Sequence, residues 1–310
     1  MRVLLTGGFG YLAGRIANSL RAGGNQVVLS AREIPAPAAE WARDFEFRRC
    51  DVLDEQPKAL LAGIEGVVHL ASLDEREAVS QPARAVLVSG EGTRLMLAAS
   101  RAAGVGRFVF FSTFHVYGPT APPRVTEETA TKASHPYAIA HLTGEGFCRA
   151  SIDSGQDVAI LRVSNGYGAP VWTAVDRWTL AHNDFSRQAV QTARIVLRSS
   201  GEQHRDFVGV EDIADATRLV LMAERRQLED GVFNVGGRCS MSVFEVALRV
   251  QAVARSRLGI DCPIERPPPV GAVAEQLDFS IDRLGKLGFT PRDRFAVETE
   301  RLFALLESTA

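Results

Sequence analysis

The segment T6-G7-G8-F9-G10-Y11-L12-A13-G14 follows directly on the apolar run RVLLT (2–6) and leads into the amphipathic run YLAGRIANSLRAGG (11–24). Glycines let the backbone turn tightly and approach a pyrophosphate, whose negative charge is met by the N-terminus of the following helix. Between a strand and a helix, this turn predicts a dinucleotide-binding site. The alternative is a tight strand–helix turn without a ligand. Ala13 stands at the third glycine position, which governs helix–strand packing and accepts Ala.

Short apolar runs of the same kind recur through the first half of the chain, at 26–30, 45–49, 66–71, 107–112 and 158–163. Strands that are apolar throughout and separated by helical segments indicate a parallel sheet covered on both faces. The sequence therefore predicts an α/β, Rossmann-type doubly wound parallel sheet with a smaller C-terminal substrate-binding lobe. The alternation ends near Asn165. We expect a dinucleotide-binding domain over 1–165 and a mainly substrate-binding lobe over 166–310, with 206–238 returning to the first domain.

The composition is that of an ordinary globular protein, with 310 residues, 46% hydrophobic, 23% charged and a net charge of -2. This balance gives no reason to expect nucleic acid as a partner. No apolar run approaches the roughly 18 residues of a membrane span. The four cysteines are scattered without a CxxC pair, so they predict isolated thiols rather than a disulfide framework or a metal site. We expect a cytoplasmic protein without a bound metal.

The residues that end the second and third strands bear on the choice of dinucleotide. An NAD-preferring site usually has an acidic residue at the end of the second strand, where it binds the ribose 2′-hydroxyl. This chain has Ser30 followed closely by Arg32, and a guanidinium favours the 2′-phosphate. The sequence therefore favours NADP(H), with NAD(H) as the alternative and a solvent-exposed Arg32 as the plainer reading. Asp51 would accept a hydrogen bond from the adenine amino group, or would cap a helix.

Seven segments, in order, make the resemblance to a known family specific. They are TGGFGYLAG (6–14), VHLA (68–71), FSTFHVYG (111–118), YAIAHLTGE (137–145), LRVSNGYG (161–168), RDFVGVED (205–212) and DFS (278–280) with LGFTP (287–291). With these motifs the chain resembles the extended short-chain dehydrogenase/reductase family, the NAD(P)-dependent nucleotide-sugar epimerases and dehydratases. The resemblance covers nearly the whole chain.

The resemblance implies roles for the matching residues. Tyr137 would be the acid/base that moves a proton on or off the sugar hydroxyl while a hydride passes to or from the nicotinamide. Thr113 would hydrogen-bond the same oxygen. Asn165 and Arg205, and by a looser alignment Arg266, would bind the nucleotide diphosphate of the substrate. The dinucleotide would be held by Gly7, Phe9, Gly10, Tyr11, Leu12, Arg32, Asp51, Val52, Leu70 and Ala71.

His141 departs from the family pattern, which has Lys four residues after the Tyr. A permanent cation there lowers the pKa of the Tyr from about 10 and binds the nicotinamide ribose. Histidine, with a pKa of about 6.5, is mostly neutral at cellular pH and can still hydrogen-bond a ribose hydroxyl. We therefore count His141 as a catalytic residue whose electrostatic contribution is altered. Lys132, five residues before Tyr137, is a candidate substitute for the missing charge.

A second departure concerns the reaction. Dehydratases of the family follow the Thr with Asp-Glu, whereas Phe114 and His115 follow Thr113 here. The sequence therefore predicts a nucleotide-sugar epimerase or 4-keto-sugar reductase and not a 4,6-dehydratase. His115 is either a replacement acid/base or a core histidine. The alternatives are a catalytically impaired dinucleotide-binding sensor or scaffold, and a reductase of a non-sugar ketone. The resemblance also suggests a homodimer formed through a helix pair.

Overall fold

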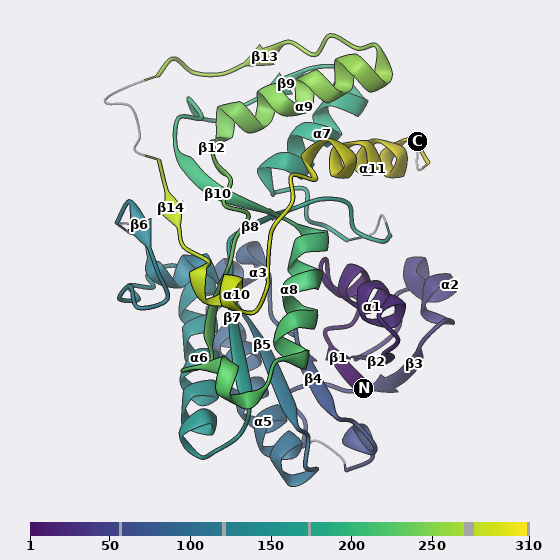
Figure 1. Ribbon diagram of the computed structural model, residues 1–310. Coiled ribbons are helices and arrows are strands. Elements are labelled where there is room, and N and C mark those ends of the chain that lie inside the picture. The colour runs from purple at the N-terminus through teal and green to yellow at the C-terminus, as the bar shows by residue number, and fades with distance from the viewer. Residues whose placement is uncertain (56–57, 120–121, 173–174, 270–275, 309–310) are drawn as a thin grey trace.

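A parallel sheet of seven strands forms the centre of the molecule (Figure 1). The computed structural model describes residues 1–55, 58–119, 122–172, 175–269 and 276–308. In their order across the sheet the strands are β11 (Val232–Val235), β7 (Val158–Val163), β5 (Arg107–Thr113), β4 (Gly66–His69), β1 (Arg2–Thr6), β2 (Gln26–Ala31) and β3 (Glu46–Arg49). The strand order reverses between β1 and β4, which places a ligand crevice at the carboxyl ends of these strands. The predicted α/β doubly wound fold is confirmed.

Alternating side chains of each strand pack into two separate cores, one on each face of the sheet. Val3 and Leu5 of β1 belong to one core, which also includes Ile16 of α1 and Ile213 of α8. Leu4, between them, belongs to the second core. Because successive side chains of a strand point to opposite faces, a strand covered on both sides must be apolar at every position. That requirement explains the continuous apolar runs of the sequence.

Helices cover both faces of the sheet. One face carries α1 (Ala13–Ala22) and α8 (Val210–Met222), and the other carries α5 (Gly92–Ala102) and α6 (Pro136–Asp153). The remaining helices that pack near the sheet are α2 (Ala39–Ala42), α3 (Glu75–Ser80), α4 (Pro82–Val86) and α10 (Asp282–Lys286). Shorter turns are η1 (Ala36–Ala38), η2 (Lys58–Leu61), η4 (Phe114–Tyr117), η5 (Arg225–Leu228) and the π-helical turn η3 (Leu87–Glu91), which joins α4 to α5.

The C-terminal half builds a smaller lobe above the carboxyl ends of the strands (Figure 1). It contains α7 (Ala181–Thr192), α9 (Val243–Leu258) and α11 (Phe295–Glu307), which share a core of their own. Its strands are β8 (Asn165–Tyr167), β10 (His204–Gly209) and β12 (Ser240–Ser242) in one small sheet, and β9 (Ile195–Val196) with β13 (Ile264–Glu265) in another. Within 206–238, β11 joins the large sheet and α8 covers it, whereas β10 lies in the small sheet. The domain boundaries given above stay a prediction.

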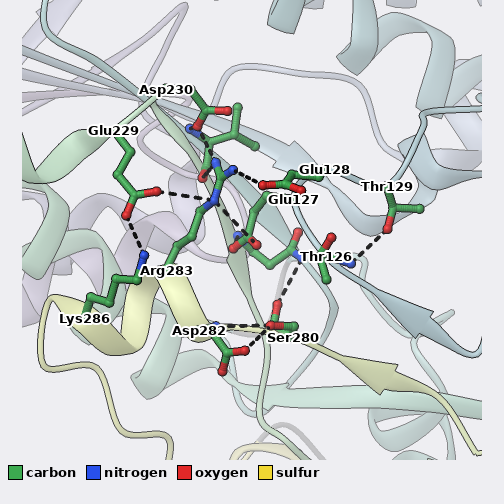
Figure 2. A network of polar contacts seen from close by, with 12 residues as sticks. Thr126, Glu127, Glu128, Thr129, Glu229, Asp230, Ser280, Asp282, Arg283 and Lys286 are labelled. Carbon is green, nitrogen blue, oxygen red and sulfur yellow. Dashed lines mark hydrogen bonds and ion pairs between the residues drawn. The ribbon is translucent and has the colours of Figure 1, made fainter.

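The chain returns to the large sheet after the smaller lobe. Strand β14 (Asp278–Phe279) pairs with β6 (Arg124–Val125), and α10 follows. Arg283 of α10 lies among four carboxylates, those of Glu127, Glu128, Glu229 and Asp230, and Lys286 pairs with Glu229 (Figure 2). These contacts fix the C-terminal segment against the loop after β6 and the start of β11.

The part of the chain that the structure describes has three further properties, which concern membrane-spanning helices, clusters of metal-binding side chains and cysteines. None of its helices combines the length and the apolarity that crossing a membrane requires. Nor do the described residues gather three or more His, Cys, Asp or Glu side chains where a metal ion could be held. No disulfide joins the four cysteines, which all lie among the described residues.

Candidate active site

The glycine-rich turn between β1 and α1 depends on the absence of side chains at defined positions. Gly7 has a φ of 65°, and a Cβ there would lie 2.9 Å from the backbone nitrogen of Ala71. Gly10 donates its N–H to the carbonyl of Gly7 at 2.9 Å. Ala13 is fully buried, and at Gly14 a Cβ would lie 2.7 Å from the Val171 side chain. Gly14 therefore lets the chain after β8 approach α1, while Ala13 is small enough for helix–sheet packing.

A cavity of about 600 Å³ opens beside this turn. It brings together eight of the ten residues predicted to bind the dinucleotide: Gly7, Phe9, Gly10, Arg32, Asp51, Val52, Leu70 and Ala71. The other two, Tyr11 and Leu12, line an adjoining cavity of about 570 Å³ that shares Gly10 and Leu70 with the first. The predicted cofactor residues thus surround one continuous groove along the carboxyl ends of the strands.

Individual cofactor residues also make contacts within the protein. Tyr11 donates its hydroxyl to the carbonyl of Gly168 at 2.7 Å, which ties the turn to the end of β8. Asp51 accepts the N–H of Leu53 at 3.0 Å, so it forms a local turn at the end of β3. Phe9 packs against the rings of Trp41, Phe47 and Trp172.

Besides Arg177 Nε, two buried polar atoms of residues that line these cavities have no hydrogen-bond partner: Ser30 Oγ and His141 Nε2. A buried polar group without a partner costs free energy unless a ligand or water satisfies it. A dinucleotide offers hydroxyl donors and acceptors along its whole length. The glycine cradle and the two unpaired atoms therefore fit such a cofactor.

The second cavity contains the predicted catalytic residues Thr113, Tyr137 and His141 together with Asn165 and Arg205. Tyr137 lies in the first turn of α6, where the helix begins at Pro136 and His135 caps its N-terminus. The Tyr137 ring makes an edge contact with His141, with centroids 4.4 Å apart, and lies 6.1 Å from the ring of His115. Residues four apart share a helix face, and this face is directed into the cavity.

The acidity of Tyr137 is set by several neighbours. Burial and the carboxylate of Glu75 raise its pKa above the ordinary value, whereas the charge of Arg177 and a hydrogen bond with Thr113 lower the pKa. Thr113 is buried and its hydroxyl also accepts the N–H of His115. The Thr113 side chain therefore lies beside the Tyr137 phenol and acts on its acidity.

His141 is held in its neutral form. Its Nδ1 lies 3.1 Å from the carbonyl oxygen of Phe111, which can only accept, so Nδ1 donates and Nε2 is left as an acceptor. Burial lowers its pKa to about 4. Lys132, the suggested replacement cation, is exposed and is not among the residues that line these cavities.

Asn165 and Arg205, the residues predicted to bind the substrate, also line a third cavity of about 680 Å³ next to Tyr137 and His115. Asn165 donates its side-chain amide to the carbonyl of Asp206 at 3.0 Å. The half-buried guanidinium of Arg205, whose pKa is lowered by burial, forms no ion pair with any described carboxylate. It is therefore available to an anionic ligand.

Arg266 is not brought to these cavities. Its Nη1 donates to the carbonyl of Ser200 at 2.6 Å, it pairs with Glu202, and its guanidinium lies 3.5 Å over the ring of Phe244. These contacts engage its charge within the smaller lobe.

Sequence reasoning missed Arg177 and Glu75, which both line the cavity of Tyr137. Arg177 Nη1 lies 2.7 Å from Glu75 Oε2 and 4.0 Å from Asp74 Oδ2. The partners are 102 residues apart in sequence. No periodicity or motif could have signalled this pair, because it joins the start of α3 to the irregular segment before α7.

Comparisons with known proteins show the family and the fold of the chain. A family model described as "NAD dependent epimerase/dehydratase family" matches residues 3–236. The dTDP-glucose 4,6-dehydratase of Streptomyces niveus is 27% identical over 96% of this chain and 90% of its own length. The UDP-glucose 4-epimerase of Azospirillum brasilense is 28% identical over 94% and 87%, respectively. The crystal structure of a Bacillus cereus UDP-glucuronic acid 4-epimerase, in complex with UDP-glucuronic acid and NAD, has the same fold, with a TM-score of 0.80, 22% identity and 100% coverage of both chains.

Proposed function

The chain belongs to the NAD dependent epimerase/dehydratase family, and from that premise we propose that it is an NAD(P)-dependent epimerase or 4-keto-sugar reductase of nucleotide-linked sugars. The observation that carries the proposal is the Tyr137–Thr113 pair in a cavity that adjoins the dinucleotide groove at one side and holds an uncommitted arginine, Arg205, at the other. A sugar placed between them would have its reacting hydroxyl at Tyr137 and its diphosphate at Arg205.

The proposed chemistry assigns one task to each residue. In the oxidative direction, Tyr137 as phenolate takes the proton of the sugar hydroxyl, and Thr113 holds the same oxygen by a hydrogen bond. The bound dinucleotide supplies the hydride acceptor, or the donor in reverse. Arg205 and Asn165 hold the diphosphate, with Arg205 providing the charge-assisted contact. His141, through the acceptor Nε2, would hold a hydroxyl of the nicotinamide ribose.

Chemistry at C4 without loss of water is favoured over dehydration. Elimination needs an additional acid/base at the neighbouring carbons, and Phe114 has no group that can carry a proton. His115 lines two cavities and its ring lies 6.1 Å from that of Tyr137, but burial lowers its pKa. The similar proteins include both a dehydratase and an epimerase. Analysis of the product distinguishes these two reactions.

NADP(H) is the proposed cofactor, with NAD(H) as the alternative. Arg32 and Arg84 both line the cavity that contains Ser30 and Asp51, and neither forms an ion pair with a described carboxylate. Two uncommitted guanidinium groups near the end of β2 favour a 2′-phosphate.

A homodimer is also part of the proposal. Leu87 of η3 and Ile139 of α6 expose 50% and 42% of their surface, although both are large apolar residues. Turn η3 packs against α6, so these side chains belong to neighbouring elements. Sedimentation velocity of the wild type and of the Ile139→Glu variant would test this, with a monomeric wild type contradicting it.

The first test of function is mass spectrometry of the dinucleotide released on denaturation, followed by turnover assays. UDP- and dTDP-linked hexoses and their 4-keto forms would be supplied with each dinucleotide, and the configuration at C4 would be read by NMR. C4 inversion or 4-keto reduction supports the proposal. A 4-keto-6-deoxy product would mean a dehydratase. Cofactor binding without turnover of any sugar would favour an impaired sensor, which the neutral His141 already motivates.

A further inference from the structure

Arg177 lies in the segment before α7 and lines the cavity of Tyr137, His141 and Thr113. Only 19% of its side chain is exposed. Its Nη1 contacts Glu75 at 2.7 Å, and its Nε is buried without a hydrogen-bond partner. A guanidinium is always protonated in proteins. Arg177 is therefore a fixed positive charge inside the site, held by the carboxylate of Glu75 and, at 4.0 Å, by that of Asp74.

The site has a specific need for such a charge. A tyrosine acts as a base only as phenolate, and burial opposes that form. The family position for a cation is occupied by His141, which donates Nδ1 to a carbonyl and is neutral. Lys132 lies outside the cavities of the site. Arg177 lines the same cavity as Tyr137 and is the described cation whose charge lowers the pKa of the phenol most.

We propose that Arg177 is a positioning residue for the reaction, supplying the positive charge that stabilises the Tyr137 phenolate, and that Glu75 sets how much of this charge reaches Tyr137. The inference rests on the proposed function, because it presumes that Tyr137 is the acid/base. Two effects of opposite sign support it. The charge of Arg177 lowers the pKa of Tyr137, and the carboxylate of Glu75 raises it. Reciprocally, although burial alone would lower the pKa of Arg177, Glu75 and Tyr137 raise it.

Charged and titratable groups reach Tyr137 from every element packed around it. They are Asp74, Glu75, Arg76 and Glu77 at the start of α3, His115 in η4, His135 and His141 at the start of α6, Asp176 and Arg177 before α7, His182 in α7 and, beyond His115, Arg205 in β10. Arg76 and Asp176 pair with each other and are largely exposed. His141 and His115 have lowered pKa values, so neither adds a charge near neutral pH. The balance at Tyr137 is therefore between Arg177 and the carboxylates of Asp74 and Glu75.

The proton transfer that accompanies oxidation of the sugar shows which role Arg177 can have. In oxidation the O–H bond of the sugar would break and its proton would pass to the Tyr137 oxygen, while the hydrogen on the same carbon would leave with its C–H electron pair as hydride, for which a dinucleotide would be the acceptor. Arg177 neither gains nor loses a proton. Its charge changes only the population of phenolate that is ready to accept one.

The test replaces Tyr137 by a difluorotyrosine, whose more acidic phenol titrates in an accessible pH range, and follows it by fluorine NMR. The Arg177→Gln change should raise the phenol pKa by about one unit, and Glu75→Gln should lower it. Arg177→Lys should restore most of the wild-type pKa. Arg76→Gln is the matched control, because Arg76 pairs with Asp176 at 3.6 Å across the same two segments but is largely exposed.

Turnover is then measured across pH in the enzyme that keeps the natural Tyr137. This measurement distinguishes an electrostatic role of Arg177 from a purely structural one. The proposal expects the pH–rate profile of Arg177→Gln to move to higher pH. A rate lowered equally at every pH, with no change in the phenol titration, would make Arg177 a structural tether and overturn the inference. That result would leave the proposed function intact. The proposed function itself fails if the Tyr137→Phe variant keeps full activity.

Discussion

His141 and Glu145 lie one turn apart on α6 and are both buried, yet they differ in how well their polar atoms are hydrogen-bonded. Glu145 accepts three hydrogen bonds, from Ser112 Oγ at 2.6 Å, Arg162 Nε at 2.9 Å and Arg162 Nη2 at 2.6 Å. His141 makes one hydrogen bond and leaves Nε2 without a partner. The same helix therefore carries a fully satisfied polar group directly beside an unsatisfied one.

The difference distinguishes the part of α6 that stabilises the fold from the part that lines the cavity. The network of Glu145 continues inward: Arg162 Nη1 donates to the Tyr117 hydroxyl at 3.0 Å, which donates to Asn234 Oδ1 at 2.6 Å. It links α6, β7, η4 and β11, with no partner left for a ligand to supply. His141 faces the cavity instead. An unpaired buried atom at a cavity wall is a position where a ligand completes the bonding.

The largest effect is expected from breaking the Glu145–Arg162 pair. Removing one partner of a buried ion pair leaves an uncompensated charge, so Glu145→Gln should lower the free energy of unfolding by about 3–5 kcal/mol. Urea unfolding would measure the loss. The double variant Glu145→Leu, Arg162→Met should cost less than the single change, since it buries no lone charge. Equal stability of Glu145→Gln and wild type would contradict the structural role of this end of α6.

At the other end, Tyr137→Phe should reduce turnover by about 10²–10⁴-fold, the usual contribution of a general acid/base. Its stability and its affinity for the dinucleotide should stay close to wild type, because the phenol ring remains in place. Cofactor fluorescence titration and steady-state rates would test both statements. Loss of cofactor binding in parallel with activity would show that the residue is needed for the fold of the groove.

His141→Lys tests whether the cavity end of α6 lacks a cation. A charge beside Tyr137 should shift the pH–rate profile down by about one unit and raise the rate near neutral pH. In the Arg177→Gln background the same change should recover much of the lost shift. Rates across pH for the two single variants and the double variant provide the measurement. A lower rate at every pH would mean that the imidazole has a role a cation cannot fill.

The smallest effect concerns the pH dependence of stability. Because the pKa of His141 falls from 6.5 to about 4 on folding, the unfolded chain binds a proton between these values that the folded chain does not. Stability therefore falls as the pH drops below about 6.5. His141→Asn should reduce this slope by up to ~1.4 kcal/mol per pH unit. Urea unfolding between about pH 5 and 7 would measure it, and identical slopes would mean that His141 is not held neutral.

Much of the fold and part of the site could be predicted because the signals are local. A strand covered on both faces is apolar at every position, and a glycine turn between a strand and a helix is read from adjacent residues. The same locality placed Tyr137 and His141 on one helix face. Eight of the predicted cofactor residues meet in one cavity for this reason, since the carboxyl ends of parallel strands lie along one edge.

The position of the Arg266 side chain could not be predicted from the neighbouring residues. Its charge is engaged with Glu202 and the ring of Phe244, away from Arg205. The direction of a side chain in an irregular segment depends on which partners the tertiary fold brings near. Nothing in the residues around position 266 specifies that choice.

The sequence by itself determined the doubly wound sheet, the glycine-rich turn between β1 and α1 and the order of the motifs, because each follows from residues that are close along the chain. Only the tertiary structure decided the electrostatics of the site. It buried His141 as a neutral donor to Phe111 and brought Arg177 to Glu75 across 102 residues. Burial and long-range charge pairs set the pKa of a group, and both arise only when distant segments pack together.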